Sequence, residues 1–157
     1  MDGKNRCDLT QLVANPTALQ HLIRSMAQPF LASRIDKVVA LEAIGFIFGA
    51  GVAVELNAGL VLVRKKGKIP WATKSGEFTD YTNKKKWFEI ANDAIQPKNN
   101  VLIVDDWSET GAQLKAAISL VESMGGVVSG IACLNIDPRA RKDRTLSNYR
   151  LLSVIEY

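Results

Sequence analysis

The sequence predicts an α/β fold, with a mostly parallel, open β-sheet flanked by helices. Short runs of β-branched and other apolar residues alternate along the chain with segments whose apolar residues recur at helical spacing. Strands that alternate with helices form parallel sheets, because each crossover runs through a helix. The 157 residues are 47% hydrophobic, which suits one core, and no repeat or linker divides them. We therefore expect residues 1–157 to form a single domain.

The first half of the chain gives one helix, one strand, a second helix and a second strand. Asn15 and Pro16 are typical of a helix start, with Asn at the cap and Pro in the first turn, and this helix should end near residues 28–29. Residues 37–41 are apolar enough for a short buried strand, and residues 42–45 form a turn. Residues 46–56 predict a helix whose small residues allow close packing against the sheet, and residues 60–64 predict the next strand.

Residues 65–83 differ from the rest, because they are rich in Lys, Gly and hydroxyl residues and show little apolar periodicity. We expect a long loop here, and loops of that length are usually functional or disordered.

The second half of the chain continues the alternation. The expected strands are 87–90, 101–104, 127–136 and 151–155, and the expected helix is 110–124, which ends at two glycines. Residues 139–144 are a basic run, best interpreted as a solvated loop.

Composition and charge exclude several classes of protein. The net charge of +4 is too small and scattered to indicate a nucleic-acid partner, although it is compatible with a local basic patch for a phosphorylated small molecule. Cys7 and Cys133 match no metal or redox spacing and are expected to be reduced thiols. There is no signal-peptide core, and no apolar run long enough for a membrane span. We expect a cytoplasmic protein that binds neither nucleic acid nor membrane.

Residues 101–113 carry the strongest functional signal. A buried strand is followed by Asp105 and Asp106, and a short polar turn then leads through Gly111 into a helix. Ligands of open parallel sheets bind beyond the carboxyl ends of the strands, and a helix N-terminus binds anions. Carboxylates accept hydrogen bonds from hydroxyls, so the segment predicts a sugar-phosphate site. The alternative is a strand that ends in acids, with Ser108 or Thr110 capping the helix. Neither a Walker motif nor a dinucleotide motif is present.

Three segments, in order along the chain, carry a resemblance to a known family. Residues 101–113 read Val-Leu-Ile-Val-Asp-Asp-Trp-Ser-Glu-Thr-Gly-Ala-Gln and resemble the 5-phosphoribosyl-1-pyrophosphate (PRPP) signature of type I phosphoribosyltransferases. Residues 39–50 are similar to the pyrophosphate loop of adenine phosphoribosyltransferases, and residues 59–70 to the segment that opens their flexible catalytic loop. Asp80 and Tyr81 fall where that subfamily has a Glu-Tyr pair.

The resemblance implies a purine, adenine-like phosphoribosyltransferase. Such a pentosyltransferase (a glycosyltransferase of purine salvage) moves ribose 5-phosphate from PRPP to a nucleobase and releases pyrophosphate. It implies Mg²⁺ held through PRPP and water, with no direct protein ligand, and a homodimer. Asp105 and Asp106 would bind the ribose hydroxyls or metal-bound water, and Asp80 and Tyr81 would lie on a loop that closes over the site. Together these four are the expected catalytic residues.

The same resemblance implies which residues hold the two phosphate groups. The pyrophosphate would meet residues of the loop after the first strand and of the basic segment, partly across the dimer interface: Ala43, Ile44, Arg64, Lys65 and Lys68. The 5-phosphate would be held by the turn after the acid pair: Ser108, Glu109, Thr110, Gly111, Ala112 and Gln113.

Several residues depart from the family pattern. Ile44 stands where the pyrophosphate loop normally has Arg, and Glu109 brings negative charge to the expected phosphate loop. Only six residues precede Cys7, so the N-terminal hood over the base is expected to be reduced. Trp107 could stack on a base or belong to the core or an interface. These departures keep an alternative open, a PRPP- or nucleotide-binding regulatory protein with weak or no catalysis.

Overall fold

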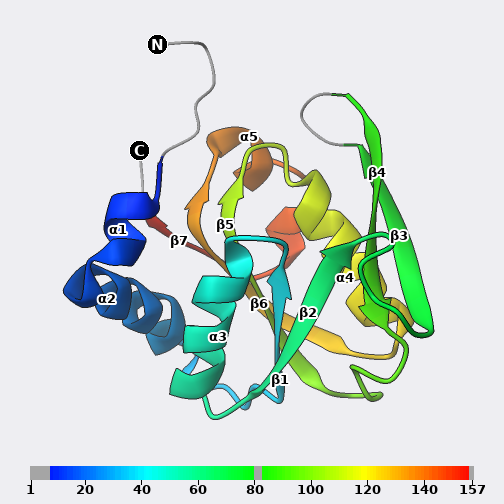
Figure 1. The fold of residues 1–157 in the computed structure, drawn as a ribbon, viewed down its shortest axis with the longest axis horizontal. Helices are drawn as coiled ribbons and strands as arrows, with labels where there is room; N and C mark the ends of the chain where they lie inside the picture. The colour runs from blue at the N-terminus through cyan, green and yellow to red at the C-terminus, as the bar shows by residue number, and fades with distance from the viewer. Residues whose placement is uncertain (1–7, 80–82, 156–157) are drawn as a thin grey trace.

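A computed structural model describes residues 8–79 and 83–155 of the chain. Its centre is a seven-stranded sheet in the order β3-β4-β2-β1-β5-β6-β7 (Figure 1). The strands are β1 (Lys37–Leu41), β2 (Gly59–Lys65), β3 (Thr73–Thr79), β4 (Lys85–Ala91), β5 (Asn100–Ser108), β6 (Val127–Ile136) and β7 (Leu151–Ile155). The helices are α1 (Thr10–Ala14), α2 (Pro16–Ala27), α3 (Gly45–Glu55), α4 (Ala112–Ser123) and α5 (Pro138–Arg141), with 3-10 turns η1 (Gln28–Phe30) and η2 (Leu146–Asn148).

The sheet separates two apolar cores. Helices α2 and α3 cover one face, where they pack against residues such as Val38 and Leu102, and α4 covers the other, against residues such as Val39 and Ile103 (Figure 1). Neighbouring strand residues point to opposite faces, which is why adjacent residues of β1 and β5 contribute to different cores. Strands β2, β1, β5, β6 and β7 are parallel, as predicted, and β4 and β3 are antiparallel additions.

The predicted helix starts and strands are largely confirmed. Asn15 caps α2, because its Oδ1 accepts a hydrogen bond of 3.0 Å from the backbone N–H of Ala18. Within the described residues, no helix is both long enough and apolar enough to traverse a bilayer. The five-residue α1 was not predicted, since it is too short to show a helical period.

The prediction of a continuous loop over residues 65–83 was wrong, because the segment contains strand β3. This strand pairs antiparallel with β4, which is itself longer than the predicted 87–90. Phe78 packs against Phe88 with ring centroids 4.5 Å apart, and it is the one buried residue of β3. A strand with a single buried residue has no alternating apolar pattern, so its pairing follows from long-range packing.

Strand β5 also differs from its prediction, because it continues through the acid pair to Ser108. The pairing with β6 extends this far, with Ser108 opposite Ile136. Helix α4 consequently starts at Ala112 instead of residue 110, and the turn between them is confined to residues 109–111. The basic run predicted as a loop, residues 139–144, begins inside the short helix α5.

Candidate active site

A cavity of about 700 Å³ opens where β1 and β5 end. These strands are parallel neighbours, so their carboxyl ends lie at the same edge of the sheet. The residues predicted for the site that line this cavity are Ala43, Ile44, Lys65, Asp106, Ser108, Glu109, Thr110, Gly111, Ala112 and Gln113. The fold therefore brings together the predicted pyrophosphate loop and the predicted 5-phosphate loop, which lie far apart in the sequence.

The two acids of the motif occupy different environments. Asp106 lines the cavity, whereas Asp105 is only 2% exposed and does not. The Oδ1 of Asp105 accepts a hydrogen bond of 2.9 Å from the backbone N–H of Asp106. Burial, reinforced by the neighbouring charge of Asp106, raises the pKa of Asp105 well above its usual value. Asp106 is thus the acid of the pair that a ligand in the cavity can reach directly.

Gly45 lets the start of α3 approach this acid pair closely. A Cβ at Gly45 would lie 3.0 Å from Oδ1 of Asp105 and 3.2 Å from its Cα. Because Gly45 has no side chain, the turn after β1 can lie against the end of β5.

The turn before α4 leaves backbone donors available at the cavity. Gly111 adopts a φ of 76° at the N-cap, and no side chain caps the helix. The Thr110 hydroxyl accepts only a long contact of 3.4 Å from the Ala112 N–H. Side-chain capping among the described residues is thus limited to this one long contact of Thr110, and the first-turn N–H groups suit an anion.

The remaining predicted cations lie on what we call the basic turn, residues 64–69. Its Lys65 lines the cavity, whereas Arg64 and Lys68 do not. Arg64 donates from Nη1 to the Lys68 carbonyl oxygen at 3.1 Å, and its Nε lies 3.6 Å from Oε2 of Glu42. The three predicted pyrophosphate cations thus belong to one compact turn beside the cavity.

Asp80 and Tyr81, predicted to act from a closing loop, lie outside the described residues. Their roles stay a prediction.

Sequence reasoning missed several residues of the cavity wall. They come from α1 and the residues around it, from the end of β1, and from the β3–β4 hairpin: Asp8, Leu9, Thr10, Val13, Ala14, Glu42, Ile47, Phe78 and Lys86. Glu42 directly follows the predicted strand 37–41, so its place at a strand end was a usable signal. The α1 residues gave none, because only the tertiary fold brings that short helix to the cavity.

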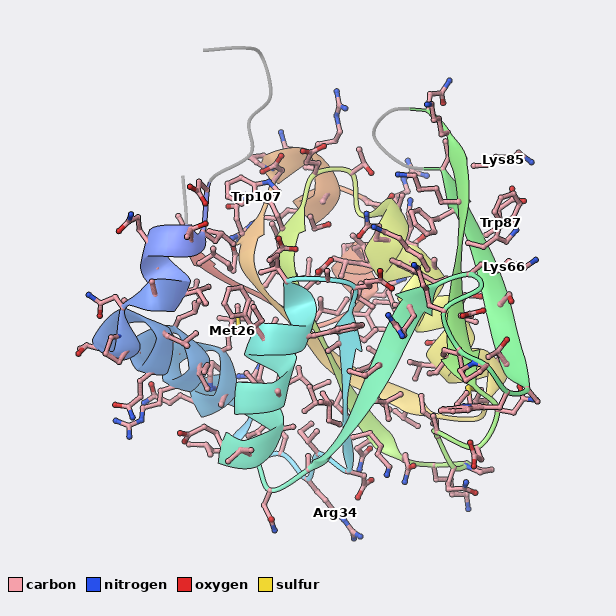
Figure 2. The ribbon with its side chains drawn as sticks, viewed as in Figure 1. Met26, Arg34, Lys66, Lys85, Trp87 and Trp107 are labelled. Carbon is pink, nitrogen blue, oxygen red and sulfur yellow. The ribbon has the colours of Figure 1, made fainter. Side chains whose placement is uncertain are left out.

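Trp107 lies at the end of β5 and lines the cavity while half-buried (Figure 2). Its indole Nε1 is buried and has no hydrogen-bond partner among the described residues. Its ring is therefore placed where it can contact a ligand, which a wholly internal tryptophan could not do.

A family model of the phosphoribosyl transferase domain matches residues 8–156. The chain belongs to this family. Adenine phosphoribosyltransferase of Thermobifida fusca is 45% identical over 127 residues, which are 81% of this chain and 72% of that protein. The resemblance to adenine phosphoribosyltransferases stated from the sequence is therefore confirmed.

Solved phosphoribosyltransferase structures share the fold. The adenine phosphoribosyltransferase of Thermoanaerobacter pseudethanolicus superposes with a TM-score of 0.90 at 34% identity, covering 97% of this chain and 88% of that one. The enzyme of Saccharomyces cerevisiae, solved with an imino-altritol bisphosphate and adenine, gives a TM-score of 0.84 at 30% identity, covering 94% and 85%. The type I phosphoribosyltransferase fold predicted from the sequence is confirmed.

Proposed function

We propose that this phosphoribosyltransferase moves ribose 5-phosphate from PRPP to adenine and releases pyrophosphate. The carrying observation is that one cavity gathers Asp106, the phosphate-type loop 108–113 and Lys65. The cavity therefore offers a single ligand a carboxylate that can accept hydrogen bonds from its hydroxyls, backbone N–H donors for a phosphate, and a cation. The Thermobifida relative is named for this activity, which supports adenine as the acceptor.

The reaction asks little covalent chemistry of the protein. As the bond at C1 of the ribose breaks, positive charge develops on the sugar and negative charge on the departing pyrophosphate. The protein's task is to position the two partners and to stabilise these charges. We assign the ribose hydroxyls to Asp106, with Asp105 behind it, and the 5-phosphate to residues 108–113. The pyrophosphate is assigned to Ala43, Ile44 and the cations of the basic turn.

The proposed cofactor is Mg²⁺, bound through PRPP oxygens and water. The chemistry of the wall fits this arrangement, because Asp106 offers a carboxylate at the cavity and hard oxygen ligands suit Mg²⁺. Its contribution when bound would be to offset the charge of the leaving pyrophosphate.

We propose that the base lies against Trp107 and the apolar part of the wall. Leu9, Val13 and Ile47 line the same cavity, so a flat aromatic base can be enclosed there on several sides. The presence of adenine in the yeast structure supports a purine acceptor.

We further propose that two copies of the chain form a homodimer. Exposed apolar side chains lie on α3 and on β2, the strand that leads into the basic turn: Val54, Leu60 and Leu62. An apolar face of this kind supports association with a second copy. The cytoplasmic location expected from the sequence stays a prediction.

The direct test is to incubate the protein with PRPP, Mg²⁺ and a panel of purine and pyrimidine bases, and to follow pyrophosphate release. Turnover with adenine above all other bases is the expected result. Tight PRPP binding without turnover on any base would overturn it in favour of a regulatory PRPP-binding protein. The presence of Ile44 and Glu109 in the cavity wall is the observation that favours this second function.

A further inference from the structure

Glu89 is a buried carboxylate that the proposed chemistry does not use. It lies in β4 between Phe88 and Ile90, is only 4% exposed, and is not among the residues that line the cavity. Acidic side chains are rarely buried this deeply unless their oxygens are paired. We therefore expect the carboxylate oxygens of Glu89 to be paired with hydrogen-bond donors.

Among the described residues, the hydrogen bonds of Glu89 go to the basic turn. One oxygen of Glu89, Oε1, accepts hydrogen bonds of 2.7 Å from the backbone N–H groups of both Lys68 and Ile69. Burial alone would raise the pKa of Glu89, but backbone N–H groups of residues 67–69 and the charge of Arg64 outweigh it and lower the pKa. Glu89 is therefore ionised at neutral pH, and these bonds are charge-assisted.

A second carboxylate holds the other end of the same turn. Oε2 of Glu42 accepts a hydrogen bond of 2.9 Å from the Lys65 N–H, and Glu42 itself lines the cavity. The turn is thus tied to the cavity wall at residue 65 and to the interior of β4 at residues 68 and 69. With both ties in place, the backbone that carries Lys65 and Lys68 is fixed before any ligand arrives.

We propose that Glu89 is a positioning residue for pyrophosphate: its buried carboxylate fixes the backbone of the basic turn, and so the place of the lysines that meet the leaving group. The inference rests on the proposed function. Fixing the turn in advance reduces the conformational entropy lost on binding. Loss of the carboxylate charge therefore weakens contacts to the pyrophosphate of PRPP and leaves contacts to the base intact.

The first test compares Glu89→Gln with wild type in steady-state kinetics. We expect KM for PRPP and the inhibition constant of free pyrophosphate to rise about tenfold together, with KM for adenine unchanged. The matched control is Glu77→Gln, an exposed carboxylate in β3 that pairs with Lys85 at 3.0 Å, and it should behave as wild type. An equal rise of both KM values, or an unchanged KM for PRPP, would overturn the proposal.

A double-mutant cycle shows whether the effect passes through the turn. Lys68→Ala alone should weaken pyrophosphate binding, and adding Glu89→Gln to it should cost much less than in the wild-type background. Residues that act through one another are non-additive in this way. Full additivity of the two losses would contradict a positioning role.

If Glu89→Gln does not fold, a second variant tests the same proposal. It changes the backbone of the basic turn and leaves the buried carboxylate in place. Gly67 has a φ of 87°, and a Cβ there would meet no atom of the described residues within 4 Å. Gly67→Ala therefore strains only the backbone, and it should reproduce the selective loss of pyrophosphate binding. Gly67→Asn is the control, because Asn adopts positive φ more readily. Equal, unchanged pyrophosphate affinity in both variants would count against the proposal.

Calorimetric binding of PRPP and pyrophosphate separates this inference from the proposed function. If the wild type shows no turnover, but Glu89→Gln binds pyrophosphate more weakly than the wild type does, the transferase function is refuted and the positioning role stands. If wild type turns over adenine and Glu89→Gln matches it in every constant, only the positioning role is refuted. A wild type that neither turns over nor binds PRPP or pyrophosphate refutes both.

Discussion

The two ends of the cavity are built in different ways. The sugar-phosphate end comes from one continuous stretch, residues 106–113, in which a strand, a turn and a helix start follow one another. The basic turn at the other end is held by Glu42 and Glu89, which lie 23 and 21 residues from the groups they bind. One end is thus local in sequence, and the other depends on contacts between distant segments.

The difference has a consequence for how each end binds charge. Under the proposed function, backbone N–H groups of α4 and a carboxylate bind the ligand at the sugar-phosphate end, where the supporting Leu114 and Leu146 are buried. At the basic turn the proposed ligand contacts are lysine side chains, and Glu42 and Glu89 hold the backbone that carries them. We therefore expect substitutions at the first end to abolish binding and those at the second to adjust it.

The strongest expected effect is that of Asp106→Asn. The change keeps the size of the side chain but replaces the carboxylate, which we propose accepts hydrogen bonds from the ribose hydroxyls, with a neutral amide. Charge-assisted bonds contribute about 1.5–3 kcal/mol each, so kcat/KM for PRPP should fall about 100-fold or more. Asp93→Asn, at an exposed position, serves as the control in the same pyrophosphate-release assay. A loss of less than fivefold would mean that Asp106 does not bind the ribose.

The same contrast explains what the sequence could predict. Residues 101–113 place acids, hydroxyls and a glycine within one strand-turn-helix pattern, so both the local structure and its chemistry follow from neighbouring residues. The strand nevertheless ends at Ser108 and not at residue 104, because its length is set by pairing with β6. Pairing between distant segments leaves no trace in the local pattern.

The basic turn shows what local sequence could not predict. Its lysines were predicted, but the carboxylates that hold them were not, since nothing near residues 64–69 points to Glu42 or Glu89. Glu89 did carry a weak signal, as an acid between Phe88 and Ile90 in a predicted strand. Strand β3 was missed for a related reason, because Phe78 is its one buried residue and the apolar partner of Phe78, Phe88, comes from β4.

Two glycines with positive φ allow the ends to be compared through stability. Gly111 has a φ of 76°, and a Cβ there would clash with the Leu146 side chain, whereas a Cβ at Gly67 would meet open space. Gly111→Ala should lower the free energy of unfolding by about 2–4 kcal/mol, from backbone strain plus overpacking. Gly67→Ala should cost about 1 kcal/mol, from strain alone. Denaturant unfolding measures both, and equal losses would show that the sugar-phosphate turn is no more tightly packed than the basic turn.

A smaller effect is expected from Ile44→Arg, which adds a cation to the cavity wall. Ile44 lines the cavity beside Ala43, where an aliphatic side chain offers pyrophosphate no donor. A new charge-assisted contact of about 1.4 kcal/mol would lower KM for PRPP about tenfold. Leu31→Arg, at an exposed position that does not line the cavity, controls for a general effect of charge. If both variants improve PRPP binding alike, the gain is electrostatic steering and not a restored pyrophosphate contact.

The smallest effect concerns the buried partner of the acid pair, and its sign follows from burial. Because the pKa of Asp105 is higher in the folded chain than in the unfolded chain, the folded state holds its proton over a pH range in which the unfolded state has lost it. Its contribution to stability is present below the unfolded pKa of about 3.8 and is lost as pH rises through the folded pKa.

Asp105→Asn keeps a neutral side chain at every pH, so the Tm of the variant should increase relative to that of the wild type as the pH increases from 4 to 8. Thermal unfolding at several pH values checks this, with Asp93→Asn as the control. A Tm difference that does not change with pH would mean that Asp105 is ionised in the folded protein throughout.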